Sequence, residues 1–185
     1  GTDPASVVAW TVSSATVPAA NPTINWAGGA GASWDTLANW SQTKYTGGTV
    51  GYYESDGVTP GVGLDAGGWL KLSGLTRGTG APTGFNSNSI VVIAPSGGGA
   101  NVTGPGADLT VRSLQLGDGL AANSLTIPAG ATLTTLDSTA VKALSTMSVE
   151  GGLVAPTLTS EGITAVSPGG AVTVDSTLAV PGRLD

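Results

Sequence analysis

The stretch Ser124-Leu125-Thr126-Ile127-Pro128-Ala129-Gly130-Ala131-Thr132-Leu133 contains the pattern that decides the fold. Two aliphatic residues flank a threonine, a Pro-Ala-Gly turn follows, and a second short run of the same kind begins after the turn. Successive side chains of a β-strand point to opposite faces of its sheet. The alternation therefore predicts two short strands, each with one apolar face, joined by a tight turn.

Related units recur on both sides of this stretch. An aliphatic–hydroxyl–aliphatic triplet occurs at 109–111, 125–127, 147–149 and 172–174, with first residues 16, 22 and 25 positions apart. The last three triplets are each followed by a second aliphatic position, at Leu133, Leu153 and Leu178. Steps of this size are typical of the coils of a parallel β-solenoid, with small aliphatic side chains inward and Ser or Thr outward.

An antiparallel β-sandwich or jelly roll would show the same alternation, because one face of each sheet is buried and the other meets water. The repeated doublet, and the absence of aromatic residues after Phe85, favour the solenoid. A short helix over 137–147 would also fit, with Ser138 as its cap and Val141, Leu144 and Met147 at helical spacing. A strand is favoured there too. We therefore expect an all-β fold with a short parallel β-helix.

The nine aromatic residues all lie at or before Phe85. We divide the chain into an N-terminal strand or arm (1–22), an aromatic, loop-rich β region (23–88) and a solenoid body (89–185). A strand is predicted over Val7–Val17, and a fully buried one over Ser89–Ala94. A short solenoid has two open ends whose backbone groups need covering. We expect the aromatic region to cover one end, and association with other chains to cover the other.

Composition and charge exclude several partners. The chain has 185 residues and a net charge of −6, and its six basic residues are scattered singly. Nucleic-acid binding needs a cationic surface, so neither nucleic acid nor an anionic membrane surface is an expected partner. No apolar run approaches the roughly 20 residues of a membrane span.

The chain has no cysteine and no histidine, which excludes disulfides, thiolate metal sites and Ser/His triads. Glycoside hydrolysis needs only two carboxyl groups, roughly 5–9.5 Å apart, and Glu54, Asp56 and Asp65 lie in one loop region. Nothing in their spacing requires them to pair. Gly117-Asp118-Gly119 looks like part of a calcium-binding turn, but the repeated nonapeptide is missing. We predict no catalytic residue, no metal site and no cofactor.

Two tryptophan-rich strings stand ahead of the body, Asn25-Trp26-Ala27-Gly28-Gly29 and Ser33-Trp34-Asp35-Thr36-Leu37-Ala38-Asn39-Trp40-Ser41. The second places two tryptophans six residues apart across a turn, with an asparagine able to bond backbone groups locally. We expect a structural cap or interface, and consider a sugar-stacking platform the weaker alternative. Its expected members are Trp26, Trp34, Asn39, Trp40 and Trp69.

These strings resemble the W-x-G-G … W-x-x-x-x-N-W-S opening that precedes β-helical repeats in autotransporter-like and other bacterial surface proteins. The resemblance continues through Ser89–Ile93, the x-L-x-L-G segment Ser113–Gly117 and Ser124–Leu133, with a long insertion between Ser41 and Ser89. It implies a right-handed β-helix with a surface-exposed structural or adhesive role, and it carries no catalytic residues.

The first residues, Gly1-Thr2-Asp3-Pro4, have neither the basic start nor the apolar core of a signal peptide. Gly1 is consistent with removal of an initiator methionine, although a processed or engineered start would look the same. We expect a complete chain made in a cytoplasm. A surface-type β-helix without a secretory signal can leave a cell by virus assembly and lysis.

The expected function is therefore that of a non-enzymatic structural protein of a virion, such as a bacteriophage. It would decorate or cement the capsid surface, or form a fibre, as a trimer whose N-terminal arm reaches a neighbouring subunit. The alternative is a bacterial surface adhesin or autotransporter passenger fragment. A polysaccharide depolymerase domain is the least favoured hypothesis.

Overall fold

The computed structural model describes residues 10–11, 22–46, 49–53, 69–73 and 76–185. The chain forms two compact units, one of residues 1–18 and 44–78 and one of residues 19–43 and 79–185. All but one of the elements in the described residues are β-strands, the exception being a single 3-10 turn, η1 (Leu37–Asn39). The all-β prediction is therefore confirmed.

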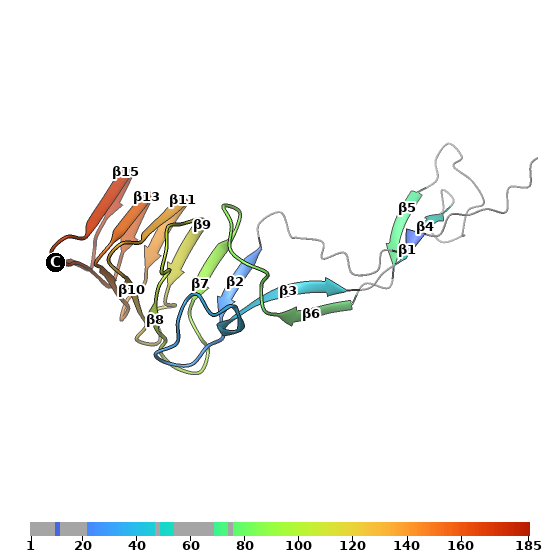
Figure 1. Ribbon diagram of the computed structural model, residues 1–185, viewed down its shortest axis with the longest axis horizontal. Coiled ribbons are helices and arrows are strands. Elements are labelled where there is room, and N and C mark those ends of the chain that lie inside the picture. The colour runs from blue at the N-terminus through green and yellow to red at the C-terminus, as the bar shows by residue number, and fades with distance from the viewer. Residues whose placement is uncertain (1–9, 12–21, 47–48, 54–68, 74–75) are drawn as a thin grey trace, which may run out of the picture. The chain divides into compact units, whose positions relative to one another are not determined.

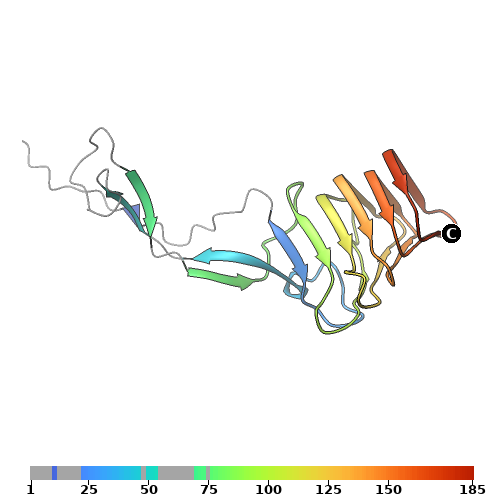
Figure 2. The same ribbon diagram turned by 180° about the vertical axis from the view of Figure 1, so that it is seen from behind.

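Two parallel sheets form the body. One contains the short strands β8 (Asn101–Thr103), β10 (Ser124–Ile127), β12 (Thr146–Val149), β14 (Ile163–Val166) and β16 (Arg183–Leu184). The other contains β7 (Ile90–Ile93), β9 (Leu109–Leu116), β11 (Thr132–Val141), β13 (Gly152–Ser160) and β15 (Ala171–Ala179). The chain alternates between the sheets and every pairing among these strands is parallel, which defines a β-solenoid and excludes the sandwich. Figures 1 and 2 show the coils stacked side by side.

The long strands bend around the core. The register of β11 shifts between Thr134 and Thr139 in its pairing with β13, and β13 shifts against β15 between Ala155 and Thr157. A shift of this kind kinks a strand. Each long strand therefore supplies two segments of the coil, and a short strand supplies a third.

This bend corrects the predicted repeat. Leu125 pairs with Met147, so the step of 22 residues is one coil. Leu109 pairs with Leu133 instead of Leu125, and Leu153 pairs with Val172, so the steps of 16 and 25 join strands of different sheets. The triplets look alike because every segment of a coil has one inward face, and alternation along the chain does not reveal which segment a triplet belongs to.

Inward side chains form continuous rows through the coils. One row runs through Ile24, Val91, Leu114, Thr139, Leu158 and Leu178. A second runs through Val102, Leu125, Met147, Thr164 and Leu184. Except for the last member of each row, these side chains are at most 1% exposed.

The repeat predicted that Ser and Thr side chains point outward, but some of them point inward. Thr135 and Thr139 are buried with their hydroxyl oxygens 3.0 Å apart, and Ser160 and Thr164 are buried with theirs 2.9 Å apart. An unpaired buried hydroxyl would cost about 1–3 kcal/mol. These four inward hydroxyls are tolerated because each has a partner four residues away in the chain.

Two local predictions are settled by the strands. The strand predicted to be fully buried is β7, in which Val91 and Ile93 are buried while Ile90 and Val92 are only half-buried, because one face looks away from the core. The alternative of a helix over 137–147 is wrong: β11 ends at Val141, a turn follows, and β12 begins at Thr146.

The stack is extended beyond β7 by antiparallel structure. Strand β2 (Thr23–Trp26) pairs in parallel with β7 and antiparallel with β3 (Trp40–Thr46), and β6 (Thr76–Gly80) follows β3 in the strand order. Residues 23–43 thus belong to the same compact unit as the solenoid, and the predicted boundaries at 22 and 88 do not coincide with the observed division.

The other unit contains an antiparallel sheet of β1 (Trp10–Thr11), β4 (Thr49–Tyr53) and β5 (Trp69–Ser73). Most of its residues come from the long insertion noted in the sequence. The strand predicted over Val7–Val17 is described only at β1, and the remainder of that prediction lies outside the described residues.

Candidate functional site

An aromatic cap closes the β2 end of the solenoid. Its members are Trp26, Trp34, Trp40 and the partly buried Phe85, and the three tryptophans are 4%, 1% and 1% exposed. The ring of Trp40 lies edge-on to those of Trp26, Trp34 and Phe85, with centroids 4.8, 4.9 and 5.1 Å away. Each such pair contributes about 0.5–1.5 kcal/mol beyond the burial of its area.

Backbone hydrogen bonds hold the connection between β2 and β3 against the first coil. The Trp34 N–H donates to the Thr103 carbonyl at 2.8 Å, and the Ala27 N–H donates to the Asn39 carbonyl at 2.8 Å. The Asn39 side chain donates to the Ser33 carbonyl at 2.9 Å, which confirms the predicted local bond. The Trp40 indole N–H donates to the Trp34 carbonyl at 2.7 Å. The cap is therefore fixed from its backbone as well as by its rings.

Four of the five predicted cap residues come together: Trp26, Trp34, Asn39 and Trp40. Trp69 lies in β5 of the other unit, and its side chain is outside what the structure describes. Because the three tryptophans of the cap are buried, they leave no ring face for a sugar to stack on. The three tryptophans therefore contribute to the packing of the core.

Sequence reasoning missed two members of this region. Phe85 packs on both Trp34 and Trp40, although it is 51 and 45 residues away from them in the chain. Gly104 has a φ of +128°, and a Cβ built there would lie 2.5 Å from the Cβ of Trp34. No local pattern marks either residue, because only the closure of the coil brings them to the cap.

The carboxylates considered for chemistry do not form a described site. Glu54, Asp56 and Asp65 lie outside the described residues. Asp118 accepts the Leu120 N–H at 2.9 Å and so closes its own turn. Within the described ranges, no group of three or more Asp or Glu residues could hold a metal ion, and no helix is long and apolar enough to cross a membrane.

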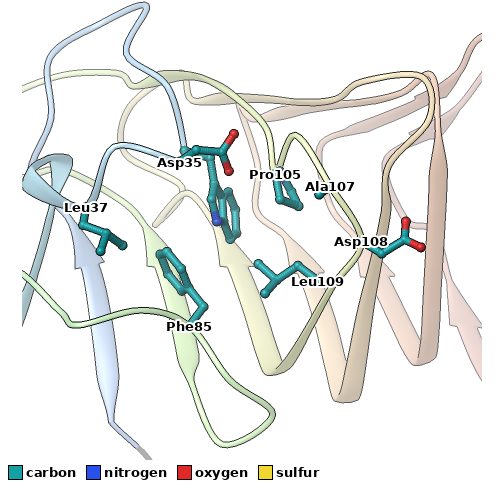
Figure 3. A pocket seen from close by; sticks show the side chains of 8 residues that line it. Asp35, Leu37, Phe85, Pro105, Ala107, Asp108 and Leu109 are labelled. Carbon is teal, nitrogen blue, oxygen red and sulfur yellow. The ribbon is translucent and has the colours of Figure 1, made fainter.

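A cleft of about 200 Å³ opens beside the cap. Figure 3 shows its lining, which is Trp34, Asp35, Leu37, Phe85, Pro105, Ala107, Asp108 and Leu109. The Asp35 carboxylate accepts the Gly106 N–H at 3.1 Å, and the Asp108 carboxylate accepts the Thr132 N–H at 2.8 Å. These backbone bonds hold in place the carboxylates of two residues that line the cleft.

At the opposite end of the solenoid, no described strand pairs with the outer edge of β15 or β16. Leu178 and Leu184 continue the two inward rows but are 52% and 48% exposed. Strands β15 and β16 are the outermost members of their sheets and pair on one side only with the described strands. Within the described residues the two ends of the stack thus differ: one carries an aromatic cap, and the other presents exposed aliphatic side chains and strand edges without a partner strand.

Searches of protein families, curated proteins and solved structures find no match to this chain. The parallel pairing of its strands defines it as a β-solenoid protein. Its two candidate interaction features are the β15–β16 end and the cleft beside the aromatic cap.

Proposed function

We propose that the chain is a non-enzymatic structural protein that associates with other protein subunits through the β15–β16 end of its solenoid. The observation that carries the proposal is the exposure of Leu178 and Leu184 at positions where every other coil buries its side chain. Full burial of a leucine is worth about 1.5–3 kcal/mol, so a neighbouring subunit on this end would gain stability from both.

The outer edge of β15 supports the same proposal. The strand is nine residues long and contains neither lysine nor proline, and its only charged residue is Asp175. Lysine, proline and short length are the usual features that keep edge strands from pairing with other chains. An edge that lacks them is suited to pairing with a neighbour.

In the finer form of the proposal, the neighbour is a subunit of a virion. The chain would decorate or cement the capsid surface, or build a fibre, as a trimer on the virion surface. A low content of charged residues, 10% of the chain against about 25% in ordinary domains, suits a protein that buries much of its surface in an assembly. The alternative is a bacterial surface adhesin, which the tryptophan motif and the solenoid fold favour.

The native mass in solution tests the assembly. Size-exclusion chromatography with light scattering should give about three times the 17.9 kDa of one chain. The double variant Leu178→Asp/Leu184→Asp should shift the mass to that of a monomer, because it places charges on the proposed contact. Leu120→Asp is the matched control, since Leu120 is 85% exposed in a turn outside both strands. A wild-type monomer at every concentration tested would contradict the proposal.

The length of the reading frame distinguishes a virion protein from a fragment of a surface adhesin. A reading frame that starts immediately before Gly1 and stops after Asp185 would favour the virion protein. A longer frame, in which these residues are one segment of a surface protein, would favour the adhesin.

A further inference from the structure

We propose that the cleft beside the aromatic cap binds an aliphatic cation, the side chain of a lysine or arginine on a partner protein. The cleft is formed by residues of the solenoid unit alone, from the β2–β3 connection, from Phe85 and from the segment that leads into β9. It shares no residue with the β15–β16 end, so this inference stands independently of the proposed function.

The size and lining of the cleft suit one side chain. Its volume of about 200 Å³ is below the roughly 300–1,000 Å³ of pockets for drug-sized ligands and cofactors. Leu37, Phe85 and Leu109 are only half-buried, so their apolar surface is still open to a ligand (Figure 3). Lysine and arginine place their aliphatic stems on such surfaces while the charged head stays near water.

The two carboxylates supply the complementary charge. Asp35 and Asp108 both line the cleft and are exposed. Each accepts one backbone N–H, and an ionised carboxylate has about four acceptor positions, so both retain the capacity to bind a cation. Gly106 and Asp108 are two residues apart, a span of at most about 7 Å, so the segment that positions one carboxylate also carries the other.

Neither carboxylate is neutralised within the described part of the chain. The ion pairs found there join Arg112 to Asp137, Lys142 to Glu161 and Arg183 to Asp185. These are all of the basic residues in the solenoid unit, which carries eight acidic and three basic residues, a net charge of −5. All basic side chains of the unit are therefore paired elsewhere, and we assign the cation to a partner protein.

Chemical-shift changes in the protein test the inference. The ¹⁵N-labelled full chain is titrated with three N-acetyl N-methylamides: those of lysine, arginine and norleucine, which keeps the stem and lacks the charge. We expect saturable shifts confined to the lining residues for lysine or arginine, with a Kd on the order of millimolar for so small a ligand. Norleucine should bind at least about tenfold more weakly, and added salt should weaken the cationic ligand.

Substitutions test whether the two carboxylates supply the charge that binds the cation. Asp35→Asn and Asp108→Asn keep an oxygen that can accept the backbone N–H, and each should weaken binding about tenfold, equivalent to about 1.4 kcal/mol. Asp118→Asn is the matched control, because that carboxylate also accepts a backbone N–H in a turn but does not line the cleft. Its Kd should equal that of wild type.

Three outcomes would overturn the inference. The first is the absence of saturable shifts with both cationic ligands. The second is norleucine binding as tightly as lysine, which would make the cleft a merely apolar one. The third is an equal loss in Asp118→Asn, which would assign the effect to overall charge. Should one cleft variant fail to fold, the other variant and the salt dependence decide. None of these results depends on the native mass that tests the proposed function.

Discussion

At the scale of single residues, the hydroxyl pairs are the most exacting feature of the core. Thr135 and Thr139 face each other inside β11, four residues apart, and neither is more than 1% exposed. Each satisfies the other, so the pair stabilises the coil only while both members are present. A hydroxyl left alone in an aliphatic core loses its bonds to water and receives nothing in exchange.

Thr139→Val should therefore destabilise the protein by about 1–3 kcal/mol, because it leaves the Thr135 hydroxyl buried without its partner. The double variant Thr135→Val/Thr139→Val should recover most of the loss, since no orphaned group remains. Urea denaturation of the three proteins checks this. A double variant that is as unstable as the single one would show that packing, and not the hydrogen bond, sets the cost.

Gly104 provides a second prediction at this scale. Gly104→Ala should lower the free energy of unfolding, because the added methyl group would lie 2.5 Å from the Trp34 Cβ and the residue has a φ of +128°. Gly98→Ala is the matched control, with a φ of +143° but nothing within 4 Å. We expect the cap variant to lose about 1–3 kcal/mol more than the control, the usual cost of overpacking. Equal losses in urea denaturation would assign the whole effect to φ.

At the scale of elements, the segment from Val141 to Met147 shows how strand, turn and strand can imitate a helix. Val141 and Met147 are fully buried in two different sheets. Leu144 lies in the turn between them with a φ of 65° and is 64% exposed. A helix would have placed all three on one buried face.

Truncation of Met147 and of Leu144 should therefore change the free energy of unfolding by different amounts. Met147→Ala should cost about 2–5 kcal/mol, because it leaves a cavity between the rows of neighbouring coils. Leu144→Ala should change the free energy of unfolding by less than about 0.5 kcal/mol, as expected of an exposed position. Chemical denaturation of both variants makes the comparison, and similar losses would contradict the strand–turn–strand assignment.

At the scale of the whole solenoid, stability depends on neighbouring coils, because each coil packs only on the coils beside it. The coil of β15 and β16 has a described neighbour on one side only. Its amides therefore rely on fewer hydrogen bonds than those of β11 and β12, which pair with strands on both sides.

Hydrogen exchange should show this difference between the coils, and should show how association changes it. In dilute protein the β15 amides should exchange faster than those of β11. At concentrations where the proposed assembly forms, β15 should gain protection while β11 changes little, because the association covers the outer edge. The Leu178→Asp/Leu184→Asp variant should show no such gain. Protection of β15 that does not depend on concentration would argue against association through this edge.

Much of the fold was predictable from the sequence because alternation is a local property. The pattern around Leu125 and Ile127 indicates a strand with one inward face. The scarcity of long segments without glycine or proline argues against helices. The spacing of Trp34 and Trp40 indicates a packed turn. The candidate site was predictable only in part. Four cap residues were identified, whereas Phe85 and the pairing of Asp35 with the segment of Asp108 were not.

The sequence by itself determined that the chain forms β-strands with one aliphatic face, and that its tryptophans precede a body of small side chains. Only the tertiary structure decided which strands stack, which hydroxyls turn inward and which end of the solenoid carries the aromatic cap. The physical reason is the sequence separation of the interactions that decide each feature. Alternation depends on adjacent residues, whereas register depends on contacts between coils, such as that of Leu133 with Leu153 twenty positions later. The coil closes through bends and turns whose lengths vary, so equal local patterns end in different places.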